Sequence, residues 1–333
     1  MTAGALTQAS SLATSETEHS GLTLANYWAC FKGIVWREVL RFLHQTERFF
    51  SALVRPLVWL FIFAAGFRQT LGVSIIPPYE TYVLYEEYVT PGLVGMILLF
   101  NAMQSSLSMV YDRETGTMRT LLVSPFPRSF LLLSKLLGGV AVALLQVLAF
   151  LAVAYFWNIQ PPPVTELKLF TAFEMPDFLP QIVGNITEPI VYPFFHVPAV
   201  LQPVMGYITI IPALVVAGLM LGSLALFMSS IIKQLENFAG VMNFVIFPMF
   251  FASSALYPLW RIRESSPLLH EICRFNPFSY CIELIRFGFY GYVDVISLAI
   301  VTACAVFFLA AAVYAYNPSK GLIGRRGGPG GGA

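Results

Sequence analysis

Long apolar stretches separated by short polar segments run through most of the chain. A bilayer core of about 30 Å needs roughly 20 apolar residues in a helix. Five of the six stretches have that length, so the pattern predicts six transmembrane helices. Their expected ranges are residues 56–71, 91–110, 136–156, 204–228, 238–257 and 295–316.

The first of these stretches is the shortest, and it lies between Arg55 and Arg68. Long basic side chains near the end of a span extend toward the aqueous interface, so we expect these arginines to mark the two ends of the first span. The other five stretches contain no Asp, Glu, Lys or Arg. Insertion demands this, because a central charge costs about 2.5–3.5 kcal/mol.

A helical periodicity of a different kind precedes the first span. Apolar residues recur at steps of three or four from Trp28 to Phe42, while Glu38 and Arg41 fall on another face. The pattern predicts an amphipathic helix over residues 24–50 in the cytoplasmic interface, with a helix packed on a soluble partner as the alternative. We expect disordered tails at both ends, over residues 1–23 and 317–333, since the first is rich in Ser and Thr and the second in Gly.

Composition and charge agree with a membrane protein and orient it. The chain is 57% hydrophobic and 11% charged, whereas a soluble domain averages about 25% charged residues. Thirteen of the 19 Lys and Arg residues lie in the N-terminal arm, the loops at 111–135 and 229–237, and the C-terminal tail. The positive-inside rule then predicts a multi-pass protein of the cell (inner) membrane with both termini in the cytoplasm.

The cytoplasmic loop after the second span predicts a short surface helix. This helix would begin at Thr115 or Thr117 as its cap and end before Pro125. Exposed apolar side chains on such a helix indicate a docking element for a protein partner, and a plain interfacial turn is the alternative. The apolar side chains are Met118, Leu121 and Leu122.

Two segments are expected on the outer side. Residues 157–203 hold 9 of the 22 prolines together with many aromatic residues, and a loop of this length predicts a partly ordered extracytoplasmic cap. Residues 258–294 alternate charged and apolar positions. They predict two short helices broken at Asn276-Pro277, which form a re-entrant hairpin between the fifth and sixth spans.

Motifs for catalysis are missing from the chain. It contains no P-loop, no His-Glu-x-x-His and no Gly-x-Ser-x-Gly, and its spans lack the acidic residues typical of ion-coupled carriers. A membrane-embedded transferase with an extracytoplasmic cap stays open as the alternative to a transporter, and an ion-coupled carrier as a third possibility. The polar residues inside the spans predict hydrogen bonds between helices; they are Asn101, Gln104, Gln146 and Asn243.

Three segments in order resemble the ABC-2 type permeases, which are the membrane subunits of ATP-driven exporters. The first segment is Glu114-Thr115-Gly116-Thr117 through Leu121, with Pro125 and Ser134-Lys135; the second is Phe247-Pro248-Met249-Phe250-Phe251 with Ser253 and Tyr257-Pro258-Leu259; the third is Asn276-Pro277-Phe278-Ser279-Tyr280 with Glu283 and Arg286. Their order is similar to the branch of polysaccharide, lipo-oligosaccharide and drug exporters. Ser134 stands where the family usually has Gly, and the 157–203 segment is longer than its usual counterpart.

The resemblance implies an all-α transmembrane domain over residues 51–316 in a homodimer or a paired permease. Each half would dock one cytoplasmic ATP-binding cassette ATPase subunit, lie among membrane lipids and bind no nucleic acid. The chain would not be an enzyme and would bind no cofactor, because ATP and Mg belong to the ATPase. The cargo would be lipid-linked, saccharide, amphipathic or drug-like.

The resemblance also assigns residues to two sites. No catalytic or metal-binding residue is implied. The ATPase-coupling residues would be Asp112, Arg113, Glu114, Thr115, Gly116, Thr117, Met118, Arg119, Leu121 and Leu122. The re-entrant hairpin motif would comprise Tyr257, Pro258, Asn276, Pro277, Glu283 and Arg286.

Overall fold

The computed structural model describes residues 23–44, 46–67, 78–79, 83–114, 125–171, 190–232 and 234–315. Most of them are helical. In chain order the long helices are α2 (Leu24–His44), α3 (Thr46–Phe67), α4 (Tyr85–Glu114), α6 (Arg128–Phe156), α7 (Gln202–Ile231), α8 (Leu235–Phe251) and α12 (Val295–Ala315). Between α8 and α12 lie three shorter helices, α9 (Leu259–Ser265), α10 (Pro267–Phe275) and α11 (Pro277–Phe289).

Within the described residues, four helices are long and apolar enough to cross a membrane. They are Tyr85–Tyr111, Ser129–Phe156, Gln202–Ile231 and Val295–Ala315. These four coincide with the predicted second, third, fourth and sixth spans. At the first and fifth predicted spans the structure has shorter apolar helices, Leu53–Ile62 within α3 and Leu235–Phe251.

The fifth predicted span ends earlier than the hydropathy pattern indicated. Helix α8 stops at Phe251 instead of continuing to Tyr257. The Ser253 hydroxyl donates to the Phe250 carbonyl at 2.6 Å and accepts from the Ala255 N–H at 3.2 Å. A serine side chain that bonds the nearby backbone competes with helical hydrogen bonds, so the chain leaves the helix here although the residues remain apolar.

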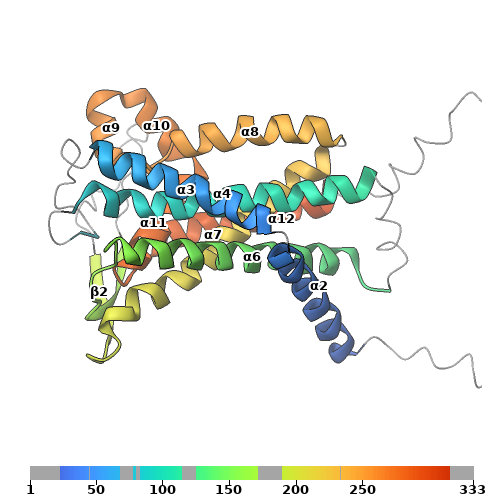
Figure 1. Ribbon diagram of the computed structural model, residues 1–333, viewed down its shortest axis with the longest axis horizontal. Coiled ribbons are helices and arrows are strands. Elements are labelled where there is room, and N and C mark those ends of the chain that lie inside the picture. Colours follow the sequence, from blue (N-terminus) through green and yellow to red (C-terminus); the bar gives the residue numbers. More distant parts are fainter. Residues whose placement is uncertain are drawn as a thin grey trace, which may run out of the picture.

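Helix α7 lies at the centre of the helical body (Figure 1), in contact with α4, α6, α11 and α12. Gly218 and Gly222 form a Gly-x-x-x-Gly pair on its surface toward α6. A Cβ at Gly222 would lie 2.3 Å from Leu136 Cδ1, and one at Gly218 would lie 3.3 Å from Val140 Cγ1. The absent side chains therefore allow α6 and α7 to approach closely, which is how helices associate in lipid.

A small sheet corrects the expectation of an all-α protein. Strands β1 (Glu166–Thr171) and β2 (Ile190–His196) pair antiparallel, and β1 pairs parallel with β3 (Tyr292–Asp294). The strand order is β2-β1-β3. The 157–203 segment therefore contributes a hairpin that is joined to the residues just before α12.

The structure shows which face of the N-terminal helix packs on the protein. Helix α2 packs on α6, and Tyr27 contacts the rings of Phe126 and Phe130 at centroid distances of 5.2 and 5.0 Å. Glu38 of the predicted polar face has a side chain only 12% exposed. Trp28 of the predicted apolar face is 65% exposed.

A glycine on α6 allows this approach. A Cβ at Gly138 would lie 3.2 Å from Glu38 Cγ and 3.6 Å from Val35 Cα. Because Gly138 has no side chain, α2 packs closely on α6 here and Glu38 is turned inward. The helix ends at His44, and residues 46–50 already belong to α3.

Candidate functional site

The predicted coupling loop joins the ends of two neighbouring helices. Asp112, Arg113 and Glu114 are the last residues of α4, and α6 begins at Arg128 after Pro127, whose backbone is extended. The other predicted coupling residues lie outside the described residues: Thr115, Gly116, Thr117, Met118, Arg119, Leu121 and Leu122.

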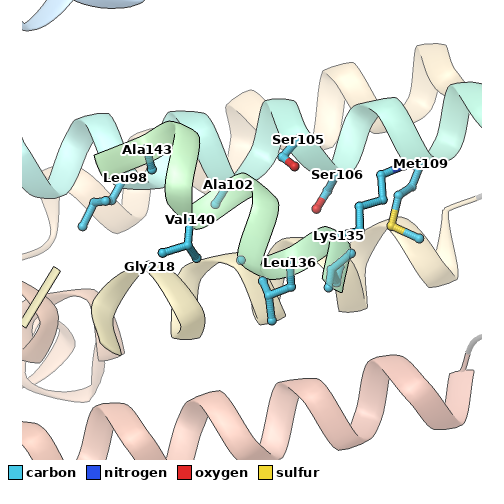
Figure 2. A pocket seen from close by; sticks show the side chains of 13 residues that line it. Leu98, Ala102, Ser105, Ser106, Met109, Lys135, Leu136, Val140, Ala143 and Gly218 are labelled. Atoms are coloured by element: carbon cyan, nitrogen blue, oxygen red, sulfur yellow. The ribbon is translucent and has the colours of Figure 1, made fainter. Parts of the chain in front are cut away.

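The two helices that carry this loop line a small hollow together with α7. Figure 2 shows Lys135 of α6 beside Ser106 and Met109 of α4. Lys135 is buried, with only 7% of the residue exposed. A Cβ at Gly139 would lie 2.8 Å from Ser105 Oγ, so α4 and α6 are in close contact at this point.

A second site surrounds the interruption after α8, at the opposite end of the helices (Figure 1). Residues 252–257 are not helical, so their carbonyls lack the partners of a continuous helix. At membrane depth such groups must be satisfied by neighbouring protein. The residues that satisfy them come from α4, from the α10–α11 break and from α11.

Asn276 occupies the break between α10 and α11 and serves both sides of it. Its Nδ2 donates to the carbonyls of Met249 at 2.7 Å and Ala252 at 2.6 Å. Its Oδ1 accepts from the Phe278 N–H at 3.0 Å, which caps α11. One amide side chain therefore ends α8 and begins α11, and the predicted helix break at Asn276-Pro277 is confirmed.

Arg286 is the charged centre of this site. Its residue is 3% exposed, and Nη2 donates to the Ser254 carbonyl at 2.7 Å. Nη1 pairs with Glu283 one turn earlier in α11. The guanidinium also lies 4.1 Å from the ring centroid of Tyr88, an arrangement that favours a desolvated cation.

Two tyrosines of α4 complete the set. Tyr88 donates its hydroxyl to the Ser254 carbonyl at 3.1 Å, and Tyr85 donates to the Leu256 carbonyl at 2.8 Å. We name Tyr85, Tyr88, Asn276, Glu283 and Arg286 the outer clamp. It fixes the non-helical segment to α4 and α11.

The remaining hairpin motif residues take no part in the clamp's side-chain hydrogen bonds. Pro258 precedes the first residue of α9, Pro277 is the first residue of α11, and Tyr257 is 41% exposed. Sequence reasoning missed Tyr85 and Tyr88, which stand three residues apart before the apolar run of the second span. That spacing places two phenols on one face of a helix. It is the feature of the sequence from which the two tyrosines could have been predicted to act together.

The polar residues within the spans behave differently from one another. Asn101 of α4 donates to the Gln146 side-chain oxygen of α6, as predicted for a hydrogen bond between helices. Gln104 lines a hollow between helices. Asn243 is exposed on α8, and its helix–helix hydrogen bond stays a prediction.

The described residues contain no group of three or more His, Cys, Asp or Glu arranged to hold a metal ion. In the first site α4 and α6 are in close contact, and in the second the outer clamp fixes a break in the helical body.

Comparison with known proteins gives consistent relatives. Residues 29–174 and 171–290 match the family model described as ABC-2 type transporter. The chain is 24% identical over 285 residues to the inner membrane transport permease YadH of Escherichia coli, covering 85% of this chain and 92% of that protein. It is 27% identical over 242 residues to the putative transport permease ycf38 of Cyanophora paradoxa, covering 71% of this chain and 66% of that protein. A shorter match, 34% identical over 93 residues, is to the probable multidrug ABC transporter permease YbhR of Escherichia coli, covering 28% of this chain and 25% of that protein.

Proposed function

The chain belongs to the ABC-2 type transporter family as a multi-pass membrane permease, and on that basis we propose that it is the permease subunit of an ATP-driven exporter. The observation that carries the proposal is the family match, which runs from residue 29 to residue 290. The cargo is lipid-linked, saccharide or amphipathic and drug-like, and it leaves the cytoplasm. A separate ATP-binding cassette ATPase holds ATP and Mg.

The proposed topology has six crossings with both termini in the cytoplasm. Helix α3 supplies the first crossing, and α8, with 17 residues, supplies the fifth and shortest crossing. Helices α9, α10 and α11 form the re-entrant hairpin on the outer side, and the outer clamp supports this assignment because it satisfies carbonyls that lipid would leave unpaired. Exposed Trp28 and Trp36 support an interfacial position for α2, since tryptophan favours the membrane–water boundary.

Coupling to the ATPase is assigned to the loop between α4 and α6. Closure of an ATPase dimer displaces the loop, and the close contact of Gly139 with Ser105 passes the displacement into both helices. A ligand shifts a conformational equilibrium only through differential contacts, so the loop must be held rigidly by the helices that flank it. The two permeases of the dimer then rock, and the cargo path opens outward between them.

The coupling role is tested by substitution in the loop. We expect Glu114→Ala and Gly116→Val each to abolish ATP-driven export while membrane insertion, followed by protease protection, stays normal. A matched control is Glu264→Ala, because Glu264 is exposed on α9 at the other end of the helices. Export at the parental rate in both loop variants, or substrate-stimulated ATP hydrolysis that is unchanged, would refute the assignment.

Purification tests the partner directly. An ATPase subunit with a P-loop should co-purify with the full chain in mild detergent, and cysteine crosslinkers placed at Met118 or Leu122 should capture it. Crosslinkers at Val200, exposed at the opposite end, serve as the control. Capture from Val200 but not from Met118 would reverse the proposed orientation.

A further inference from the structure

A polar hollow opens among helices that are otherwise apolar. One part lies between α2, α4 and α6, and the other lies between α3, α4 and α6. Asn101, Gln104 and Gln146 line both parts, so the two parts meet at these amides. We name the combined space the amide hollow.

The hollow extends from the N-terminal helix to the middle of α4. Glu38 and Arg41, in the last two turns of α2, line the larger part together with Ser105 and Ser108. Arg55 lines the smaller part. The polar wall is therefore a path from the end occupied by α2 to Asn101, which is near the centre of the 30-residue helix α4.

Arg55 is unusual for a residue in an apolar helix. It follows the start of α3 at Thr46 by nine positions, and its guanidinium lies 3.9 Å from the ring centroid of Phe100. No carboxylate that the structure describes forms an ion pair with it. Arg55 is exposed and stands at the end of the predicted first span, where a long basic side chain can reach a charged group at the membrane interface.

The balance of charge in the hollow is positive. The Glu38 carboxylate is already neutralised by Arg37 at 3.0 Å and by Arg41 at 3.7 Å. Arg55 adds a further cation. The Nε2 groups of Gln104 and Gln146 add uncharged donors, since the Gln146 oxygen is the acceptor already taken by Asn101. Two guanidinium groups with amide donors between them suit a phosphate.

An apolar surface continues from the charged wall. Helix α3 presents Val54, Val58, Phe61 and Ile62 to the outside, all at least 48% exposed. Their spacing places them on one stripe of the helix. A ligand whose phosphate sits at Arg55 would find a surface for acyl chains on the same helix.

From these observations we infer that the amide hollow binds the phosphate head group of an anionic amphiphile from the cytoplasmic leaflet. Arg41 and Arg55 supply the charged contacts, Gln104 and Gln146 supply deep hydrogen bonds, and the α3 stripe receives the chains. The inference deepens the proposed export function, on which its assignment of leaflet rests, by naming the chemistry of a ligand.

The test is a binding measurement on the full chain, purified in detergent and stripped of lipid, without any ATPase. Short-chain phosphatidylglycerol, short-chain phosphatidylcholine and inorganic phosphate are titrated, and occupancy is counted by native mass spectrometry. We expect phosphatidylglycerol to bind more tightly than phosphatidylcholine. Arg41→Gln and Arg55→Gln should each weaken phosphatidylglycerol binding roughly tenfold or more, as expected for loss of a hydrogen bond between charged groups.

Two further variants separate a specific contact from a general effect. Lys32→Gln removes a cation on the exposed side of α2 that does not line the hollow, and it should leave binding unchanged. Arg55→Lys keeps the charge and should retain most of the affinity that Arg55→Gln loses. If Arg55→Gln proves too unstable to purify, Arg41→Gln and Arg55→Lys carry the comparison.

Several outcomes would overturn the inference. They are equal affinity for the two lipids, an equal loss in Lys32→Gln, or unchanged binding in both arginine variants. Inorganic phosphate should compete only at concentrations at least roughly a hundredfold higher, because it has no chains to bury; equal competition would assign the site to free phosphate instead. Since no ATPase is present, failure here leaves the export assignment intact, and failure of export leaves this binding result intact.

Discussion

At the scale of single residues, Arg286 is the group on which the break after α8 depends most. Its guanidinium is buried, binds the Ser254 carbonyl and pairs with Glu283. Arg286→Leu would leave that carbonyl and carboxylate without their partner, and breaking a buried pair typically costs about 3–5 kcal/mol. We expect a large fall in the melting temperature in detergent, measured by the change in intrinsic tryptophan fluorescence on heating.

The control for this substitution is Arg263→Leu on α9, where the arginine is exposed. Changes at exposed positions usually stay within about 0.5 kcal/mol. If both variants melt at the parental temperature, Arg286 does not support the outer clamp.

Asp294 gives a prediction about pH. Its side chain is buried before α12, where it accepts from the Ile296 N–H at 3.1 Å and from the Ser297 hydroxyl. Burial raises the pKa of Asp294 above its ordinary value of 3.8, and the hydrogen bonds from Ser297 and Ile296 oppose this only in part. The folded protein therefore keeps a proton that the unfolded chain has already lost, so the contribution to stability is present at low pH and is lost as pH rises through the folded-state pKa.

Asp294→Asn should remove this dependence, because an amide does not titrate. The helix cap should be kept, since asparagine also caps helices well. We expect the parent to lose stability relative to the variant as the pH rises above an unfolded-state pKa near 3.9, until it passes the raised folded-state pKa. Melting temperatures of the two proteins across that range test the sign. A difference that stays constant with pH would show that Asp294 does not titrate in this window.

At the scale of elements, the glycines of α4 decide how close its neighbours come. A Cβ at Gly92 would lie 2.5 Å from the backbone oxygen of Ala255, which cannot move without disturbing the outer clamp. Gly92→Ala should therefore destabilise the fold by about 1–3 kcal/mol, as overpacking does. Gly240→Ala is the matched control, since nothing lies within 4 Å of a Cβ there, and it should be neutral or stabilising through helix propensity.

Hydropathy and charge predicted the apolar helices because both are properties of local sequence. The break at Asn276-Pro277 was also local, since proline disfavours helix at the residue before it. The early end of α8 is local only in part, because Ser253 bonds the backbone on either side of it whereas the non-helical segment is held by Tyr85 and Tyr88 from α4. The inward turn of Glu38 is not local, because it depends on Gly138 in α6. The sheet was missed because β3 pairs with a strand more than 100 residues earlier, and such pairing leaves no periodicity in a three-residue segment.

At the scale of the whole molecule, the proposed orientation predicts which ends of the helices are accessible from outside. Val200, 88% exposed near the start of α7, and Gln234, between α7 and α8, lie at opposite ends of α7. In intact cells a membrane-impermeant maleimide should label Val200→Cys well above the parent chain, which has four cysteines of its own. Gln234→Cys should be labelled only after the membrane is opened. Labelling of both variants in intact cells, or of Gln234→Cys alone, would contradict the proposed topology.

The brevity of α8 has a consequence for the lipid around it. The helix has 17 residues, which at 1.5 Å per residue amounts to about 25 Å, less than the roughly 30 Å of a typical hydrocarbon core. Exposed Phe244 and Phe247 turn toward the surroundings along this short length. A bilayer adapts to a short apolar surface by becoming thinner beside it. We therefore expect local thinning of the membrane next to α8, where a head group would cross a thinner hydrocarbon layer. The export rate in reconstituted vesicles should then fall as the acyl chains are lengthened.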